Sequence, residues 1–241
     1  MGLHETHERA FTFRHRLPRE APVDRHEALL DAARGRRVIH VGFVDELVEQ
    51  KVEGRVWLHE RLAGVAGQLV GLDLSERGVA WAQGRGLEAH VVDCQSEEDV
   101  RALGLEPADV VVAGEILEHL DAPGPFLRAM RLLVRPGGLL LVTTPNAYRL
   151  LNFLAPLSGR ELVHPDHTLW SSPRTLRTLL ERAGWRVERL GYYANPGRAV
   201  VSGPAATRAA GHAANAARWL VRRNRLAPWW SDGLIAWARP A

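Results

Sequence analysis

A glycine and two carboxylates, at Gly42, Asp73 and Asp93, each end a short run of residues typical of a β-strand. In a parallel sheet the carboxyl ends of neighbouring strands meet at one edge, and ligands bind there. A glycine at that edge lets the backbone approach a ligand closely. A carboxylate after the second strand can accept hydrogen bonds from both hydroxyls of a ribose. The pattern therefore predicts a site for a cofactor that carries an adenosine group.

The loop after Gly42 decides between two classes of such cofactor. A dinucleotide needs a G-x-G-x-x-G loop, so that the N-terminus of a helix can bind the pyrophosphate. Here Phe43, Val44, Asp45 and Glu46 follow the glycine, and the two carboxylates would repel a pyrophosphate. A nucleotide-dependent oxidoreductase is therefore disfavoured. The same two acids also suit the first turn of a helix, where they need no ligand.

Two longer stretches carry a resemblance to a known family. They run Asp-Val-Val-Val-Ala-Gly-Glu-Ile-Leu-Glu-His-Leu-Asp-Ala-Pro over 109–123 and Leu-Val-Arg-Pro-Gly-Gly-Leu-Leu-Leu-Val-Thr-Thr-Pro-Asn over 133–146. They resemble the fourth-strand and fifth-strand motifs of the class I S-adenosylmethionine-dependent methyltransferases, in the small-molecule branch that includes ubiquinone-pathway O-methyltransferases. The resemblance covers roughly residues 36–193 and the final strand.

The resemblance implies S-adenosyl-L-methionine as the cofactor and methyl transfer to a small-molecule or sugar-like acceptor, with oxygen as the acceptor atom. It places Gly42 and Phe43 against the methionine part of the cofactor, Asp73 at the ribose, and Asp93 with Cys94 beside the adenine. The implied cofactor-binding residues are Gly42, Phe43, Asp73, Leu74, Asp93, Cys94 and Glu115, the last of which would close the floor of the site.

The first motif departs from the family pattern. The family usually has an acid where His40 stands, and glycines where Val44 and Glu46 stand. The first crossover, from Gly42 to Asp73, spans about thirty residues rather than roughly 20, and it contains Trp57-Leu58-His59. A subgroup linked to glycan and natural-product pathways resembles this chain in both respects. The altered motif leaves a second hypothesis open, a non-catalytic methyltransferase-like binding or scaffold protein.

Two histidines near the expected methyl-transfer point, His119 and His167, are the candidates for catalysis. His119 follows Glu118 just past the fourth strand, where an imidazole could act as a base for a hydroxyl. Methyl transfer from a sulfonium needs mainly alignment and desolvation, so packing roles for both histidines stay open. His164 and His167 also suggest a metal site, but a turn through Pro165 should point the two rings apart, and we expect no metal.

The order of predicted elements matches a doubly wound sheet. Five strand-like runs alternate with helical patterns, which implies a Rossmann-like α/β fold of about seven strands, mostly parallel with an antiparallel last strand. Asp24 and Ser172 are predicted N-caps of helices. The strand-like runs are 38–42, 68–73, 88–93, 109–113, 139–143, 185–193 and 232–239, with a sharp turn at 135–138 and a helical excursion at 205–226.

A chain of 241 residues is long enough for one large core. We expect an N-terminal arm and cap helix over 1–35 and a methyltransferase domain over 36–241, with 145–170 and 205–230 covering the acceptor. Cys94 is the single cysteine, no apolar run reaches the roughly 20 residues of a membrane span, and the net charge is only +3. These features predict a cytoplasmic protein with a small-molecule substrate, no nucleic-acid partner and no membrane span.

Overall fold

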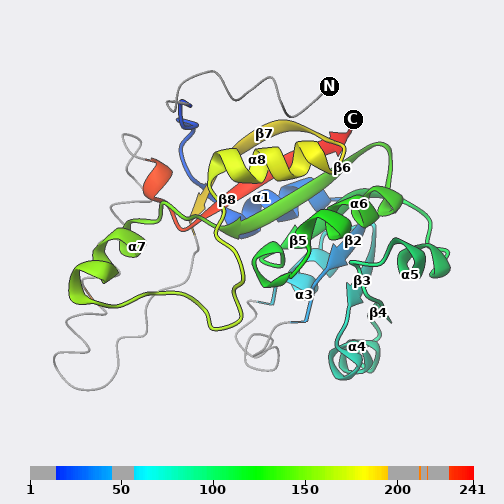
Figure 1. Cartoon of the computed structure of the whole chain (residues 1–241). Coiled ribbons are helices and arrows are strands. Elements are labelled where there is room, and N and C mark those ends of the chain that lie inside the picture. Colours follow the sequence, from blue (N-terminus) through cyan, green and yellow to red (C-terminus); the bar gives the residue numbers. More distant parts are fainter. Residues whose placement is uncertain (1–14, 45–56, 195–211, 213–215, 217–227) are drawn as a thin grey trace.

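The computed structural model describes residues 15–44, 57–194, 212, 216 and 228–241. Its backbone forms eight strands, which all belong to one sheet (Figure 1). The strands are β1 (Val23–Asp24), β2 (Arg37–Val41), β3 (Gln68–Asp73), β4 (Glu88–Val91), β5 (Ala108–Gly114), β6 (Val134–Pro145), β7 (Trp185–Ala194) and β8 (Gly233–Pro240).

The sheet has the order β1-β7-β8-β6-β5-β2-β3-β4. Strands β2 to β6 pair in parallel, and β1 pairs in parallel with β7. Strand β8 runs antiparallel to both of its neighbours, β6 and β7. The predicted doubly wound, mostly parallel sheet with an antiparallel last strand is therefore confirmed.

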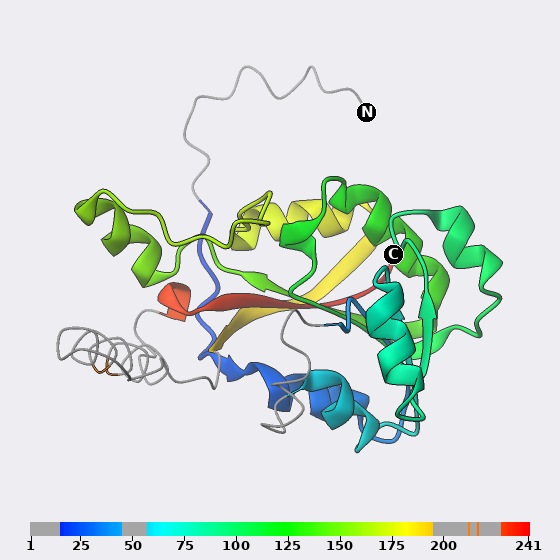
Figure 2. The ribbon, with the colours of Figure 1, turned by 90° about the horizontal axis from the view of Figure 1, so that it is seen from below.

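Helices cover both faces of the sheet, as the two views in Figures 1 and 2 show. The helices are α1 (Arg25–Ala33), α3 (Leu58–Ala63), α4 (Glu76–Gln83), α5 (Glu97–Ala102), α6 (Pro123–Leu133), α7 (Leu150–Leu154) and α8 (Pro173–Arg182), with short 3₁₀ turns η1 (Leu117–His119), η2 (Ala155–Ser158) and η3 (Pro228–Trp230). No helix among the described residues is long and apolar enough to cross a membrane.

The central strand β5 shows why the sheet lies between two helical layers. Val110 and Val112 belong to the apolar cluster that includes α1 and α3, whereas Val111 and Ala113 belong to the cluster that includes α6 and α8. Side chains alternate between the faces of a strand, so an uninterrupted apolar run must be buried on both sides. All four side chains are fully buried.

The predicted helix starts at Asp24 and Ser172 are confirmed. The Asp24 carboxylate accepts the backbone N–H of Glu27, and the Ser172 hydroxyl accepts that of Thr175. The Thr175 hydroxyl in turn accepts the backbone N–H of Ser172, which completes a reciprocal cap. Local polar side chains therefore decide where these helices begin.

Two predictions for the sheet need correction. The predicted turn at 135–138 lies within β6, as an irregular insertion between the pairs Ala108–Val134 and Val110–Leu139. Residues 23–24, expected to belong to a loose arm, form β1 and pair with the outer edge of β7. The backbone groups at an open edge strand need hydrogen-bond partners, which favours this pairing.

The predicted helical excursion at 205–226, with most of the covering segment 205–230, lies outside the described residues.

His40 of β2 and His59 of α3 form a buried pair, with their Nδ1 atoms 3.2 Å apart. One ring donates and the other accepts, which requires at least one neutral imidazole. His59 also stacks on Phe43, with 4.4 Å between ring centroids. Gly71 makes room for this, because a Cβ there would lie 2.8 Å from the Phe43 ring and 2.9 Å from His59. The unusual His40 and the unusual Trp57-Leu58-His59 are thus parts of one packing unit.

Burial disfavours the charged form of both imidazoles. It lowers the pKa of His40 well below 6.5, and the charges of His59, Arg25 and His26 lower it further. Burial alone lowers the pKa of His59 to about 4. When the pKa of a histidine is lower in the folded than in the unfolded chain, the neutral histidine stabilises the fold at pH values above the unfolded pKa. This stabilisation is lost as the pH falls through the folded pKa.

We therefore expect the free energy of unfolding to fall by about 2 to 3 kcal/mol from pH 7 to pH 4.5 through His59 alone. Urea unfolding at the two pH values measures this. The variant His59→Gln should lose this part of the acid sensitivity. The control His90→Gln, in the edge strand β4, should retain it. An equal acid sensitivity in His59→Gln and the wild-type chain would refute the assignment.

Candidate functional site

The carboxyl ends of β2 and β3, with the segments after β4 and β5, form a pocket that we call the strand-end pocket. Its cavity volume is about 110 Å³, below the roughly 300 to 1,000 Å³ of pockets that enclose a whole ligand. The described residues therefore account for one wall of a site. This wall consists of Val41, Gly42, Leu72, Asp73, Leu74, Val92, Asp93, Cys94, Gln95, Ile116, Leu120 and Phe126.

Five of the seven predicted cofactor-binding residues lie together in the strand-end pocket: Gly42, Asp73, Leu74, Asp93 and Cys94. They come from three segments, because Gly42 follows β2, Asp73 and Leu74 lie at the end of β3, and Asp93 and Cys94 follow β4. This is expected when parallel strands end side by side. The sequence therefore predicted that these five residues lie together, and their binding of a cofactor stays a prediction.

Gly42 has a conformation that favours glycine. Its φ is +67°, in the left-handed region that side chains rarely adopt. A Cβ at this position would lie 2.6 Å from Cδ1 of Ile116, which itself lines the pocket. The missing side chain therefore sets the shape of the pocket wall.

Asp73 is held by the backbone on both sides of it. One carboxylate oxygen accepts the N–H of Val44 at 2.9 Å, and the other accepts the N–H of Ser75 at 3.0 Å. A carboxylate has about four acceptor sites, and backbone bonds of this kind fix its orientation. Asp93 is held similarly, by the N–H of Gln95 at 2.9 Å. Both acids can present oxygen atoms to hydroxyl or amino groups of a ligand.

Cys94 carries a thiol and not a thiolate at neutral pH. Burial raises the pKa of this thiol to about 12, and the charges of Asp73 and Asp93 also raise it. A nucleophilic cysteine needs the opposite surroundings. Cys94 therefore serves as a small apolar part of the pocket wall.

Phe43 and Glu115 are not among the residues that line the strand-end pocket. The Phe43 side chain is buried against His59, and its backbone oxygen accepts the indole N–H of Trp57 at 3.0 Å. Glu115 accepts the hydroxyl hydrogen of Tyr193 at 2.7 Å. Contact of either residue with a cofactor stays a prediction.

Glu118 is a buried carboxyl group that the sequence argument treated only as a neighbour of His119. Its side chain is 1% exposed and accepts the hydroxyl hydrogen of Thr144 at 3.0 Å. Burial raises the pKa of Glu118 to about 8, and the nearby charge of Glu115 raises it as well. An acid at the start of a helix after an apolar strand gives no sequence signal that it is buried.

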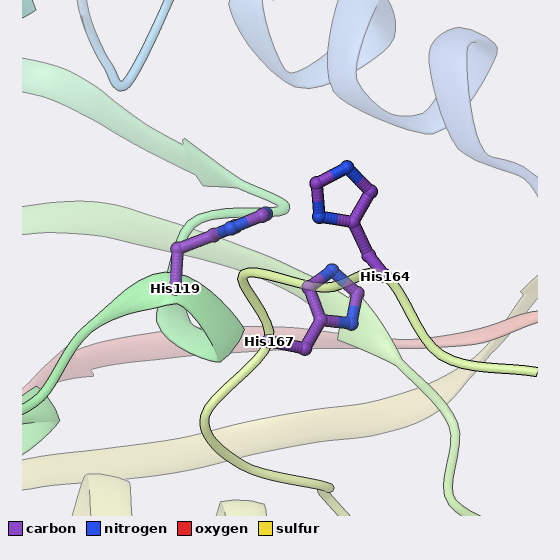
Figure 3. Close-up of side chains that lie close together, drawn as sticks. All are labelled: His119, His164 and His167. Carbon is purple, nitrogen blue, oxygen red and sulfur yellow. The ribbon is translucent and has the colours of Figure 1, made fainter. Parts of the chain in front are cut away.

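Three histidines, His119, His164 and His167, gather beside the strand-end pocket, and we call them the histidine cluster (Figure 3). Ring centroids lie 4.6 Å apart for His119 and His167, 5.6 Å for His119 and His164, and 5.3 Å for His164 and His167. The expected divergence of His164 and His167 is therefore wrong. The turn between them closes with a hydrogen bond from the His167 N–H to the His164 oxygen, which brings both rings together.

The three rings of the histidine cluster differ in their exposure to solvent. His119 is exposed, whereas the other two rings are half-buried. Burial lowers the pKa of His167, and the neighbouring His119 and His164 lower it further, against smaller opposing effects of Glu115 and Asp166. Neutral imidazole can accept a proton or bind a metal ion. Both predicted catalytic histidines are thus in one place.

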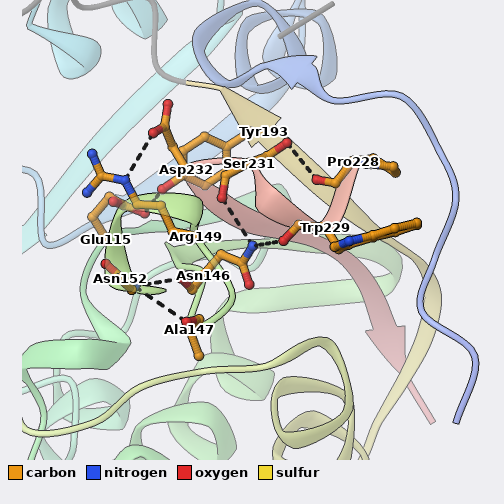
Figure 4. Close-up of polar contacts among 10 residues, drawn as sticks. All are labelled: Glu115, Asn146, Ala147, Arg149, Asn152, Tyr193, Pro228, Trp229, Ser231 and Asp232. Atoms are coloured by element: carbon orange, nitrogen blue, oxygen red, sulfur yellow. Dashed lines mark hydrogen bonds and ion pairs between the residues drawn. The ribbon is translucent and has the colours of Figure 1, made fainter. Parts of the chain in front are cut away.

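Asn146 ties the end of β6 to the start of β8 (Figure 4). The side chain is fully buried, and its amide group donates to the backbone oxygens of Trp229 at 2.7 Å and Ser231 at 3.1 Å. Its own oxygen accepts the N–H of Tyr148 at 3.0 Å. These bonds anchor the segment that leads from the sheet edge toward the histidine cluster.

Comparison with known proteins gives concordant results. A family model described as "Methyltransferase domain" matches residues 13–190. A ubiquinone biosynthesis O-methyltransferase of Bordetella avium is 32% identical over 140 residues, which are 57% of this chain and 54% of that protein. A protein of Mycolicibacterium smegmatis named "Probable S-adenosylmethionine-dependent methyltransferase" is 34% identical over 130 residues, which are 53% of this chain and 47% of that protein. The chain thus spans about half the length of the curated relatives it matches.

Among solved structures, an S-adenosylmethionine-dependent methyltransferase from Archaeoglobus fulgidus has a TM-score of 0.55 and 18% sequence identity. The match covers 89% of this chain and 90% of that one. At this level of identity the likeness shows a shared fold, and function has to be argued from the site.

The variant Asn146→Ala should lower the free energy of unfolding by about 2 to 4 kcal/mol, because it leaves buried backbone groups without partners. The variant Asn152→Ala is the matched control, since its amide makes longer contacts, at 3.2 and 3.4 Å. That control should lose less than about 1 kcal/mol. Chemical unfolding of both variants measures the difference, and equal losses would contradict an anchoring role.

Proposed function

The chain belongs to the class I S-adenosylmethionine-dependent methyltransferase family, and on that premise we propose that it methylates an oxygen atom of a small-molecule or sugar-like acceptor. S-Adenosyl-L-methionine supplies an electrophilic methyl group on a positively charged sulfur when bound. Support for oxygen as the acceptor atom comes from the names of the relatives and from the imidazoles beside the pocket.

The strand-end pocket is the observation that carries this proposal. Leu74, Val92 and Phe126 give it apolar sides suited to a flat base, while the Asp73 and Asp93 carboxylates lie at its wall. This combination of apolar side chains and carboxylates fits an adenosine group, which needs an apolar slot and hydrogen-bond acceptors for its hydroxyl and amino groups. We assign Gly42, Asp73, Leu74, Asp93 and Cys94 to cofactor binding. Phe43 contributes through its backbone beside the methionine part, since its ring is buried, and Glu115 closes the floor of the site.

The acceptor site lies on the other side of η1 from the strand-end pocket. Ile116 and Leu120, which flank η1, line that pocket, and His119 is part of η1. His119 and His167 are the catalytic residues of the proposal, since an imidazole at this place can take up the proton of an acceptor hydroxyl. Burial raises the pKa of the adjacent Glu118, which disfavours a negative charge on that carboxyl group.

The segment 145–170 covers the acceptor in this proposal. It includes α7 and η2, and several of its apolar side chains are exposed: Phe153, Leu154, Leu157 and Leu162. Apolar groups that face solvent suit a cover over a partly apolar acceptor and help to exclude water from the reacting centre.

Product formation tests the proposed function directly. The full chain is incubated with S-adenosylmethionine and with three acceptor classes, a catechol, a carboxylic acid and a monosaccharide, and release of S-adenosylhomocysteine is measured. We expect release with at least one hydroxyl acceptor and a methyl ether in the product. Cofactor binding without release for every class would instead support the non-catalytic binding or scaffold protein.

The variant Asp73→Ala should weaken S-adenosylmethionine binding by about 1 to 3 kcal/mol, because hydroxyl groups of the ribose lose a charged partner. This corresponds to a rise in the dissociation constant of about 5- to 150-fold. Isothermal titration calorimetry measures it, and the variant Asp31→Ala, an exposed acid of α1, is the control. Unchanged affinity in folded Asp73→Ala would contradict the ribose assignment.

The variant Gly42→Ala should weaken cofactor binding at least about 10-fold, because a new Cβ pushes Ile116 into the pocket in addition to the strain of a positive φ. Gly86→Ala is the matched control. Gly86 also has a positive φ, of +77°, but a Cβ there would meet nothing within 4 Å. Equal effects of the two variants on affinity would show that the contact with Ile116 is unimportant.

A further inference from the structure

The histidine cluster has the geometry of a metal-binding group. Each of the three side chains offers one ring nitrogen, and these three nitrogens lie within 4.8 Å of one another. Zinc binds imidazole nitrogen at about 2.0 to 2.1 Å, so ligand nitrogens in a tetrahedral site lie about 3.3 Å apart. Rotations of the rings, which lie close together in Figure 3, would close the remaining distance.

The backbone around the histidine cluster is fixed at short range. The Thr168 N–H donates to the backbone oxygen of Glu118 at 2.7 Å. The Thr168 hydroxyl contacts the oxygens of Glu118 and Leu120 at 3.1 and 2.9 Å. The loop that carries His164 and His167 is thus bound to the residues on either side of His119. Ligands held in place before binding lose little conformational entropy when a metal binds.

Asp166 contacts the imidazole of His164, one of the three proposed ligands. Its backbone N–H lies 3.3 Å from Nδ1 of His164, and its carboxylate lies 3.9 Å from the same nitrogen. Metal-binding histidines commonly donate the ring N–H that does not face the metal to a carboxylate, which sets the orientation of the ring. The Asp166 carboxylate is the group that fits this role, whereas the Asp166 N–H would have to give up its bond to Nδ1 of His164.

The donor set indicates which ion would bind. Three imidazole nitrogens suit borderline ions such as Zn²⁺, Co²⁺ or Ni²⁺, whereas Mg²⁺ and Ca²⁺ prefer oxygen ligands. Zinc sites with three protein ligands and one open position are characteristic of catalysis, while structural sites usually have four protein ligands.

We infer that His119, His164 and His167 bind one zinc-type divalent ion whose open coordination position receives the hydroxyl oxygen of the methyl acceptor. The ion site stands on the geometry of the cluster, whereas the role of the open position rests on the proposed function. This site replaces the expectation from the sequence that no metal binds, because that expectation depended on diverging rings.

A cation at this place would help the proposed reaction in one defined step. A hydroxyl bound to zinc loses its proton far more easily than a free one, as zinc-bound water does. In this form the imidazole nitrogens of His119 and His167 bind the ion instead of taking up the proton, which passes to solvent water. The acceptor oxygen forms the new C–O bond with the methyl carbon. The C–S bond breaks at the same time, and its electron pair stays on sulfur, which becomes a neutral thioether.

Metal titration of the full chain tests the ion site. Chain freed of metal with a chelator is titrated with Zn²⁺ by calorimetry, and with Co²⁺ by visible absorption, which reports tetrahedral nitrogen coordination. We expect one ion per chain. The variants His119→Gln, His164→Gln and His167→Gln should each weaken Zn²⁺ binding at least about 10-fold. The control His90→Gln removes a histidine from β4 and should leave binding unchanged. No stoichiometric binding, or binding that all three cluster variants retain, would overturn the site.

The two proposals fail in different ways. S-Adenosylmethionine affinity is measured in the same cluster variants and should stay within about threefold of the wild type, since the cluster does not line the strand-end pocket. Release of S-adenosylhomocysteine should fall at least about 10-fold when zinc is removed and return when zinc is added back. Equal release with and without zinc would overturn the role of the open position, and absence of cofactor binding would overturn the proposed function instead.

Discussion

Two left-handed residues at the ends of the neighbouring strands β2 and β5 decide how the chain leaves the sheet, and the site depends on them. Gly42 has a φ of +67°, and Glu115 has a φ of +56°. Among the described residues, Glu115 is the only residue other than glycine with a positive φ. A side chain in this region costs about 1 to 2 kcal/mol. Bonds of Glu115 to Tyr193 and to the backbone of Thr143 offset that cost. Between the two turns, Ile116 reaches the pocket wall and η1 follows directly.

The position of η1 separates two chemically different environments. On one side lies the strand-end pocket, with apolar walls and two fixed carboxylates, Asp73 and Asp93. η1 itself carries His119 of the histidine cluster and the buried Glu118. A short 3₁₀ turn therefore places a methyl donor and its acceptor on adjacent sides of one backbone segment in the proposed function.

The family pattern of the first motif is altered here without loss of packing. His40 stands where the family usually has an acid, and it pairs with His59 from the first crossover. Phe43 and Trp57 fill the space around the pair, with the indole N–H bound to the Phe43 oxygen. A buried acid in this place would need its own partner or a proton. One hydrogen bond joins the two imidazoles, while Nε2 of His59 is buried with no partner among the described residues. The altered motif thus keeps an intact sheet edge.

The sequence by itself determined the elements, their order and five residues of the strand-end pocket. Strand periodicity, N-caps such as Ser172 and the residue that ends a strand, such as Asp73, are local properties of the backbone, so they can be inferred without a fold. The tertiary structure alone decided which distant groups meet. His119 lies against His167 where Thr168 binds the backbone of Glu118, 50 residues away. Tyr193 meets Glu115 across 78 residues, and Phe43 turns to the core because Gly71 leaves room for its ring. Contacts of this kind depend on loop closure, rotamers and burial, which the spacing of residues along the chain does not encode.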